Sequence, residues 1–243
     1  MRTATPGQLP LEIEPRPNYT AAAFIKGASN EAARIWLDRT EVWPEGRLAL
    51  WGEADRGKTH LLRIWAARTG AASMNGPALA GFPEVTSPVG AAVDDADQAN
   101  EAALLHLLNS ARDLGRPVLL AGRLPPARWP TALRDLASRL RAVTAVEVQA
   151  PDDAMMRDLL MLWLTERRLV AGESLHVRLL RHLPRSPEVL RAAVARLDRD
   201  ATASRRRTVT ATMLRAALAQ GLEHDDPAKF TPETASPSSP AGG

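Results

Sequence analysis

The sequence predicts an α/β domain with a five-stranded parallel sheet, followed by a small C-terminal domain made of α-helices. Over residues 19–150 five short apolar runs alternate with helical patterns, and over 151–222 only helical patterns occur. Strands that alternate with helices form a parallel sheet, because each helix returns the chain to the starting edge of the sheet. A glycine-rich loop directly after the first apolar run is the third observation behind this class.

Each strand is expected from a short run of apolar or small residues. The first is Arg47–Trp51, and the last, Val143–Val148, alternates along its length as a strand does. The other strands are expected around 72–74, in the run 87–93, and over 117–121.

The helices are expected from apolar periodicity and from residues that cap a first turn. Ser29 and Asn30 are predicted to cap a helix over 31–38, whose apolar face should carry Ala32, Ile35 and Trp36. A second helix should begin at Lys58. The remaining helices should cover 100–114, 154–168, 173–183, 187–197 and 211–222.

The two ends of the chain differ in composition from the two domains. Residues 1–18 contain several prolines and no helical period, so we expect an extended arm. Residues 223–243 are rich in Pro, Ser, Thr and Gly, which predicts a disordered tail.

Composition limits the class of protein. The 243 residues include no cysteine, which excludes disulfides and cysteine-based metal sites. No apolar stretch reaches about 18 residues and no N-terminal region resembles a signal peptide, so we expect a cytoplasmic protein without membrane contact. The formal net charge of +3 permits an acidic or nucleic-acid partner but is too small to require one.

The glycine-rich loop is predicted to bind phosphate. Gly52 and Gly57 let the backbone curl so that its N–H groups point at phosphate oxygens, and the next helix adds its positive end. Lys58 should contact the β- and γ-phosphates, and the Thr59 hydroxyl should ligate Mg²⁺. The alternative, a glycine-rich turn that matches by chance, is disfavoured by the strand–loop–helix setting. The residues assigned to this loop are Gly52, Glu53, Ala54, Asp55, Arg56, Gly57, Lys58, Thr59 and His60.

An acidic pair follows the strand that ends at Val93. Asp94, at the tip of a buried strand, is expected to hold Mg²⁺ through water, and Asp95 to lie beside an attacking water. Asp is also favoured at a helix start, so the alternative is that this pair only caps the next helix.

Several stretches resemble the DnaA clade of AAA+ ATPases, and together they span residues 19 to about 220. The resemblance implies an AAA+ P-loop domain with a helical lid that binds ADP or ATP, and it puts Phe24 and Ile25 near the adenine. The similar stretches are Phe24–Asn30, Gly57–Leu61, Val93–Asp95, Pro125–Pro126, Asp135–Leu140 and Arg196–Thr210.

The same resemblance assigns Arg139 as an arginine finger, a guanidinium that stabilises the charge of a γ-phosphate bound to a neighbouring subunit. The target would be ATP on DnaA. The alternative is a surface arginine paired with Asp135, four residues earlier on the same helix face.

Two positions depart from the family pattern. Arg123 stands in the sensor 1 region, where it cannot accept a hydrogen bond from an attacking water. Glu188 stands where the family's sensor 2 arginine belongs, and Arg185 or Arg191 would have to replace it. We therefore expect nucleotide binding with slow or absent hydrolysis by the chain itself.

The arm contains a peptide that resembles the motif that docks on the bacterial sliding clamp. Gln8 would make polar contacts, while Leu9, Leu11 and Ile13 would fill apolar pockets. The alternative is an ordinary disordered arm. The arrangement resembles the Hda-like family of regulatory inactivators. This resemblance implies that the partners are DnaA, the clamp and, through the clamp, DNA. Whether the chain forms a homodimer is left open by the sequence.

Two other functions are also compatible with the sequence. An intact phosphate loop and acidic pair are also compatible with an autonomous AAA+ ATPase, such as a motor or helicase loader. A direct DNA-binding regulator acting through its arginines is less favoured, because the net charge is small and no helix-turn-helix follows the lid.

Overall fold

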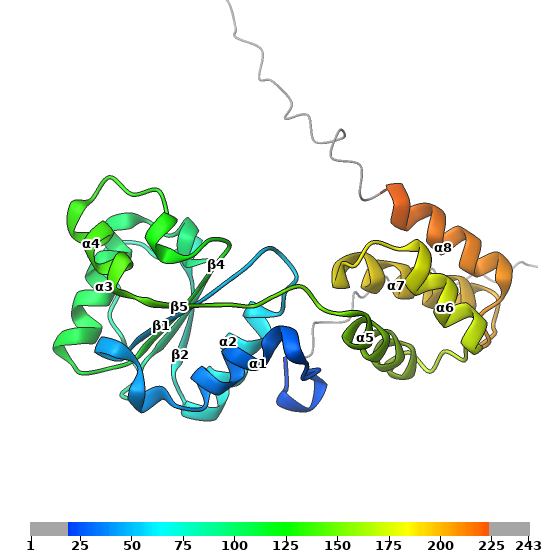
Figure 1. Cartoon of the computed structure of the whole chain (residues 1–243), viewed down its shortest axis with the longest axis horizontal. Coiled ribbons are helices and arrows are strands. Elements are labelled where there is room, and N and C mark those ends of the chain that lie inside the picture. The colour runs from blue at the N-terminus through cyan, green and yellow to red at the C-terminus, as the bar shows by residue number, and fades with distance from the viewer. Residues whose placement is uncertain (1–18, 224–243) are drawn as a thin grey trace, which may run out of the picture.

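Residues 19–223 are described by the computed structural model, in which five parallel strands form one sheet (Figure 1). The order across the sheet is β2-β3-β4-β1-β5. The predicted arm, with Gln8, Leu9, Leu11 and Ile13, and the predicted tail from 224 onward lie outside the described residues. The strands are β1 (Arg47–Trp51), β2 (Ala72–Asn75), β3 (Ala91–Asp94), β4 (Val118–Gly122) and β5 (Thr144–Glu147).

β1 lies between β4 and β5, so its two edges are both hydrogen-bonded. Leu48 is in register with Leu119 on one side and with Thr144 on the other. The prediction of a five-stranded parallel sheet is confirmed. Because all five strands run the same way, their carboxyl ends lie at one end of the sheet and their amino ends at the other.

Helices cover both faces of the sheet. The side chains of β1 alternate, with Ala49 in the core formed with α3 and α4, and Leu48 and Leu50 in the core formed with α1 and α2. The helices of this part are α1 (Ala28–Leu37), α2 (Lys58–Thr69), α3 (Glu101–Asp113) and α4 (Arg134–Ala142), and 3₁₀ turns occur at 21–23, 40–42, 44–46, 76–78, 96–98 and 126–128.

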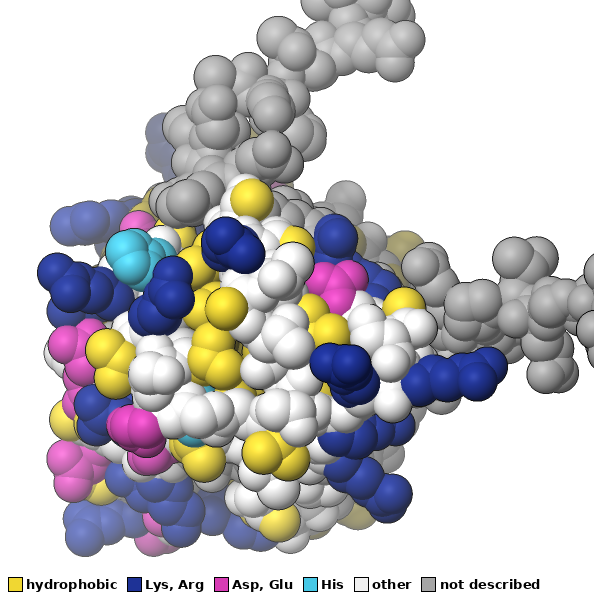
Figure 2. All heavy atoms as spheres, turned by 90° about the vertical axis from the view of Figure 1, so that its right-hand side faces the viewer, with side chains coloured by type: hydrophobic (Ala, Val, Ile, Leu, Met, Phe, Trp, Pro, Cys, Tyr) yellow, Lys and Arg dark blue, Asp and Glu magenta, His cyan; other side chains and the backbone are white. Residues whose placement is uncertain are grey.

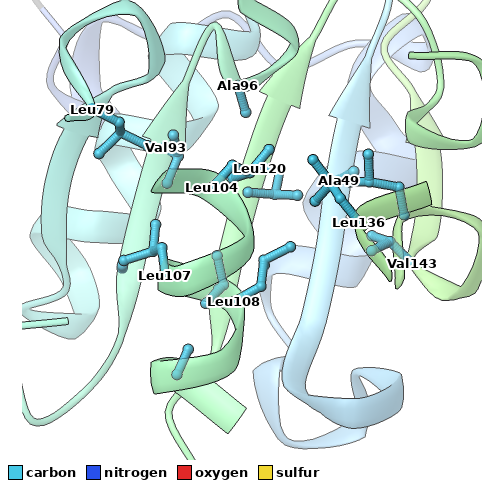
Figure 3. Close-up of a cluster of buried hydrophobic side chains, with 14 of the residues drawn as sticks. Ala49, Leu79, Val93, Ala96, Leu104, Leu107, Leu108, Leu120, Leu136 and Val143 are labelled. Carbon is cyan, nitrogen blue, oxygen red and sulfur yellow. The ribbon is translucent and has the colours of Figure 1, made fainter. Parts of the chain in front are cut away.

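The core on the α3 side is made of leucines facing small and branched strand residues (Figure 3). Leu104, Leu107 and Leu108 of α3 are 0–2% exposed and pack against strand residues that include Val93 and Leu120. Burial of such side chains stabilises the sheet by about 1.5–3 kcal/mol each. This packing holds the carboxyl end of β3 beside that of β4.

Four further helices form a second group with its own core (Figure 1). Trp163, Leu190, Leu197 and Leu214 lie in this core, and a parallel bridge joins Val170 to Thr208. Seen from this end of the molecule in Figure 2, basic side chains are spread over the face and its margin, with hydrophobic side chains between them and acidic ones mainly on the left. The helices are α5 (Asp153–Glu166), α6 (Glu173–His182), α7 (Pro187–Ala203) and α8 (Ala211–Glu223).

The expected start of α1 is wrong. Of its expected apolar face, Trp36 packs against the core, while Ala32 and Ile35 are exposed. The N-cap is Gly27, and Asn30 reaches back to accept a hydrogen bond from the Gly27 N–H at 3.2 Å. Ala33 and Leu37 are buried, while Ile35 is 52% exposed. The helix therefore begins earlier than expected and is rotated, because its inner face packs on the side of β5.

Two helices of the second group end elsewhere than expected. α5 stops at Glu166, since Arg168 adopts a positive φ of 54° and turns the chain. α7 continues to Ala203, where Arg196 and Asp200 pair one turn apart at 3.1 Å and Ala201 is buried. Among residues 19–223, no helix combines the length and apolarity needed to cross a membrane.

Candidate functional site

The loop between β1 and α2 has a backbone that only particular residues permit. Gly52 has φ +147°, and a Cβ there would lie 2.6 Å from the Val148 carbonyl oxygen. Gly57, with φ +89°, is the N-cap of α2. Glycine adopts both conformations without the strain that a side chain would add. The first turn of α2 therefore opens toward the loop with its N–H groups unused by the helix.

Lys58 is buried in this loop at 9% exposure. Its Nζ donates hydrogen bonds of 2.6 Å to the carbonyl oxygens of Gly52 and Glu53. Burial lowers the pKa of Lys58, and the negative charges of the nearby Asp94 and Asp95 oppose that shift. A buried ammonium that is held only by carbonyl oxygens favours an anionic ligand, because carbonyls do not neutralise its charge.

Three acids at the end of β3 and just after it, Asp94, Asp95 and Asp97, act on this lysine through their charge. Burial raises the pKa of Asp95, and the neighbouring charges of Asp94 and Asp97 raise it further. Asp95 adopts a left-handed backbone with φ 48°, and its N–H donates to Asp94 Oδ1 at 3.2 Å. A cation at this point would relieve the repulsion among the acids.

A magnesium ion is compatible with these residues without a dedicated cage. No group of three or more His, Cys, Asp or Glu side chains with metal-site geometry occurs within residues 19–223. Mg²⁺ binds through one or two protein oxygens, phosphates and water, so the residues present are compatible with Thr59 as a direct ligand and Asp94 acting through water.

Asp97 is a site residue that the sequence analysis did not assign. Its Oδ2 accepts a hydrogen bond from the Arg123 N–H at 2.8 Å, while its buried Oδ1 has no partner. Its charge acts on both Lys58 and Asp95. The run of acids after β3 was the available signal, but only the folded chain brings Arg123, at the end of β4, against Asp97.

Aromatic side chains line the other side of the loop. The ring of Phe24 lies 5.0 Å from that of His60, and the ring of Tyr19 lies 5.5 Å from it, both edge-on. His60 Nε2 is 2.9 Å from the Thr20 carbonyl oxygen. Tyr19 was not assigned from the sequence. These rings offer flat apolar surfaces suited to a base.

The second helical group contributes Arg191. Its guanidinium lies 4.9 Å above the ring of Trp163, and both residues line the same cleft as Glu188. Arg185 instead pairs with Asp153 at 3.0 Å and is not among the residues that line this cleft. Of the two arginines left open by the sequence, the structure brings Arg191 to the cleft.

One cleft of about 530 Å³ collects most of these side chains. It runs between the phosphate loop and the second helical group. At this cleft the Ser29 hydroxyl of α1 donates to Met155 Sδ of α5 at 3.4 Å. Among the residues predicted as a cofactor site, those that line it are Phe24, Ile25, Asp55, Arg56, Gly57, Lys58, Thr59, His60 and Arg191. Gly52, Glu53 and Ala54 form the loop behind them.

Arg139 lies elsewhere. It lines a different cleft, together with Gly46 and Arg116, which precede β1 and β4. The phosphate loop follows β1, so about 16 Å of strand separates the two ends. The alternative pairing with Asp135 is not formed: within residues 19–223 Arg139 has no ion pair, and its buried Nε has no hydrogen-bond partner.

Solved structures with a similar fold include an initiator and a motor. The chain matches domain III of the Thermotoga maritima replication initiation protein DnaA with a TM-score of 0.70 and 17% identity, over 86% of this chain and 98% of that one. It matches AMPPCP-bound DnaA from Aquifex aeolicus with a TM-score of 0.58 and 17% identity, over 74% and 64%.

The Thermotoga maritima RuvB Holliday junction branch migration motor matches with a TM-score of 0.62 and 15% identity, over 84% of this chain and 72% of that one. No protein-family model and no curated protein sequence matches the chain. The chain therefore has a DnaA-like AAA+ fold, with a parallel α/β sheet and additional helices.

Proposed function

We propose that the chain is a nucleotide-binding, Hda-like regulator of replication initiation that stimulates hydrolysis of ATP on DnaA. The observation that carries this proposal is Arg139, a partly buried arginine whose Nε has no partner. It lies at the end of the sheet opposite the chain's own phosphate loop. In that position it can reach a nucleotide only on a second subunit.

The chain's own nucleotide is proposed to bind in the 530 Å³ cleft. Lys58 and the α2 N-terminus would take the phosphates, and Phe24 with His60 would contact the base. Thr59 and Asp94 would hold Mg²⁺, which neutralises phosphate charge when bound. A solved DnaA structure of the same fold contains AMPPCP, which supports this assignment.

Hydrolysis of ATP bound to the chain itself is proposed to be slow, so that the bound nucleotide serves mainly to set the conformation of the chain. Arg123 is exposed at the end of β4, and its N–H is bonded to Asp97. A guanidinium there cannot accept a proton from an attacking water. Asp97 is a carboxylate near the acidic pair, and this observation keeps the autonomous ATPase as the second candidate.

Attachment to the sliding clamp is proposed through Gln8, Leu9, Leu11 and Ile13 of the arm. An extended peptide with alternating apolar side chains can fill pockets on a partner while its backbone stays accessible. Through the clamp the chain would reach DNA and DnaA. Pull-down of the full chain on the clamp, with Gln8→Ala and Leu11→Ala, tests this attachment separately.

The deciding experiment measures phosphate release from ATP-loaded DnaA with the full chain and DNA-loaded clamp. Arg139→Ala should abolish most of the stimulation, since a finger contributes on the order of 10³-fold or more to hydrolysis. Arg141→Ala is the matched control, because Arg141 is exposed on the same helix. Strong turnover by this chain alone, without stimulation of DnaA, would instead establish the autonomous ATPase.

A further inference from the structure

The cleft that contains Arg139 is open and rich in arginine. It has a volume of about 700 Å³ and lies at the amino ends of β1 and β4, between the last turns of α3 and α4. Arg112, Arg116 and Arg139 line it, with the carboxylates of Glu45 and Asp135.

A fourth arginine, Arg47, is buried behind the residues that line this cleft. The side chain of Arg47 is 3% exposed and pairs with Glu45 at 3.4 Å. Burial lowers the pKa of Arg47, Glu45 opposes this, and the charges of Arg139 and Arg112 lower it further. The guanidinium groups are therefore close enough to repel one another.

The acids nearby do not neutralise all of this charge. Glu45 pairs with Arg47, and Asp113 pairs with Arg112 at 3.2 Å. Within residues 19–223, neither Arg116 nor Arg139 has a carboxylate within 4.0 Å, although Asp135 also lines the cleft. Two positive charges are thus left without a counterion.

The carbonyl groups at the end of α3 do not account for these arginines. Backbone N–H groups of Leu114, Gly115 and Arg116 already cap that helix at 2.8–3.1 Å. Arg116 donates through Nη1 to the Val85 carbonyl, which uses one of its five N–H donors. The Nε of Arg139 is buried without an acceptor, which is costly unless a ligand supplies one.

We propose that this cleft is a second anion site, in which Arg112, Arg116 and Arg139 bind a phosphate group on this chain. Guanidinium groups match the oxygens of phosphate in pairs of hydrogen bonds. The phosphate is either free in solution or the end of a nucleotide held by a partner. With free phosphate as the ligand the site is independent of the proposed function; with a partner's nucleotide it rests on that function.

The test titrates inorganic phosphate into the full chain saturated with ADP, so that the phosphate loop is already occupied. Chloride at matched ionic strength is the reference, and the thermal midpoint and calorimetric binding are the measurements. Phosphate should raise the midpoint by ligand linkage. Arg116→Gln and Arg112→Gln should weaken binding at least about tenfold, while Arg141→Gln on the same helix α4 should not.

ADP binding by each variant shows that it is folded. Arg116→Gln also removes the hydrogen bond to the Val85 carbonyl, whereas Arg112→Gln tests the site with that hydrogen bond in place. Absence of a phosphate-specific shift in the wild type, or an equal loss in Arg141→Gln, would overturn the site. The source is then identified with ATP-loaded DnaA. If Arg116→Gln also loses the stimulation of ATP hydrolysis on DnaA, the phosphate belongs to the partner's nucleotide. If the stimulation is unchanged, the ligand is free phosphate. In both cases the phosphate site itself has been established by the titration.

Discussion

Lys58 stabilises its own loop before any ligand arrives, because its ammonium is the donor for two loop carbonyls at 2.6 Å. Lys58→Met should therefore weaken ADP binding more than about tenfold, since a charge-assisted contact to phosphate is lost. Fluorescence titration with a labelled ADP measures this. Lys26→Met, at an exposed position, is the matched control, and equal affinities of the two variants would contradict the assignment.

His60 makes the stability of this region depend on pH. Burial lowers the pKa of His60 from its ordinary value of 6.5, the contact with the Thr20 carbonyl opposes this, and Arg191 lowers it again. The folded state therefore favours the neutral ring, whose contribution to stability is complete above 6.5 and is lost as pH falls below it.

We expect the wild type to lose more thermal stability than His60→Gln between about pH 7.5 and 5.5, as measured by calorimetry. Bound ADP should be absent in one series and saturating in another, since the ring also faces the cleft. Parallel pH profiles of the two proteins would show that His60 does not titrate in this range.

At the scale of elements, Glu101 joins the start of α3 to the start of α4. Its carboxylate accepts hydrogen bonds from the Thr131 hydroxyl at 2.7 Å and from the N–H groups of Ala132 and Leu133. The bond from Thr131 is the largest cause that lowers the pKa of Glu101 below 4.5, followed by Leu133 and Ala132. This contact helps to position α4 and hence Arg139.

Glu101→Gln should increase hydrogen exchange at Ala132 and Leu133 and reduce stimulation of a partner less than Arg139→Ala does. In the wild type the same bonds are present above 4.5 and lost as pH falls through the lowered pKa. Glu31→Gln, at an exposed position of α1 away from the cleft, is the control. Unchanged exchange at Ala132 and Leu133 would contradict this role.

Among the elements, the strands and the phosphate loop were the most predictable parts. Short apolar runs such as Arg47–Trp51 have few alternatives to a buried strand, and the pattern of Gly52, Gly57 and Lys58 depends on local backbone conformation alone. The face of α1 was predicted correctly at Trp36 and wrongly at Ile35. Ile35 is apolar yet exposed, because the orientation of a helix follows from its neighbours in space and not only from its own periodicity.

At the scale of the whole molecule, the α/β part and the second helical group both line the 530 Å³ cleft. Arg191→Ala should weaken ATP binding about tenfold, whereas Glu188→Gln should not weaken it, since a carboxylate facing phosphate repels it. Arg185→Ala is the matched control, because Arg185 pairs with Asp153 away from the cleft. Calorimetric titration with ADP and a non-hydrolysable ATP analogue measures these effects. Equal losses in Arg191→Ala and Arg185→Ala would contradict the assignment.

The sequence by itself determined the α/β class, the number of strands and the position of the glycine-containing loop between β1 and α2, since each depends on periodicity or on turns within a few residues. Only the tertiary structure decided the strand order, the exposure of Ile35 and the choice of Arg191 over Arg185. It also brought Asp97 to Arg123 and left Arg139 without an ion pair to Asp135, although both line one cleft. These are contacts or separations set by packing between elements, and sequence patterns within one element do not encode them.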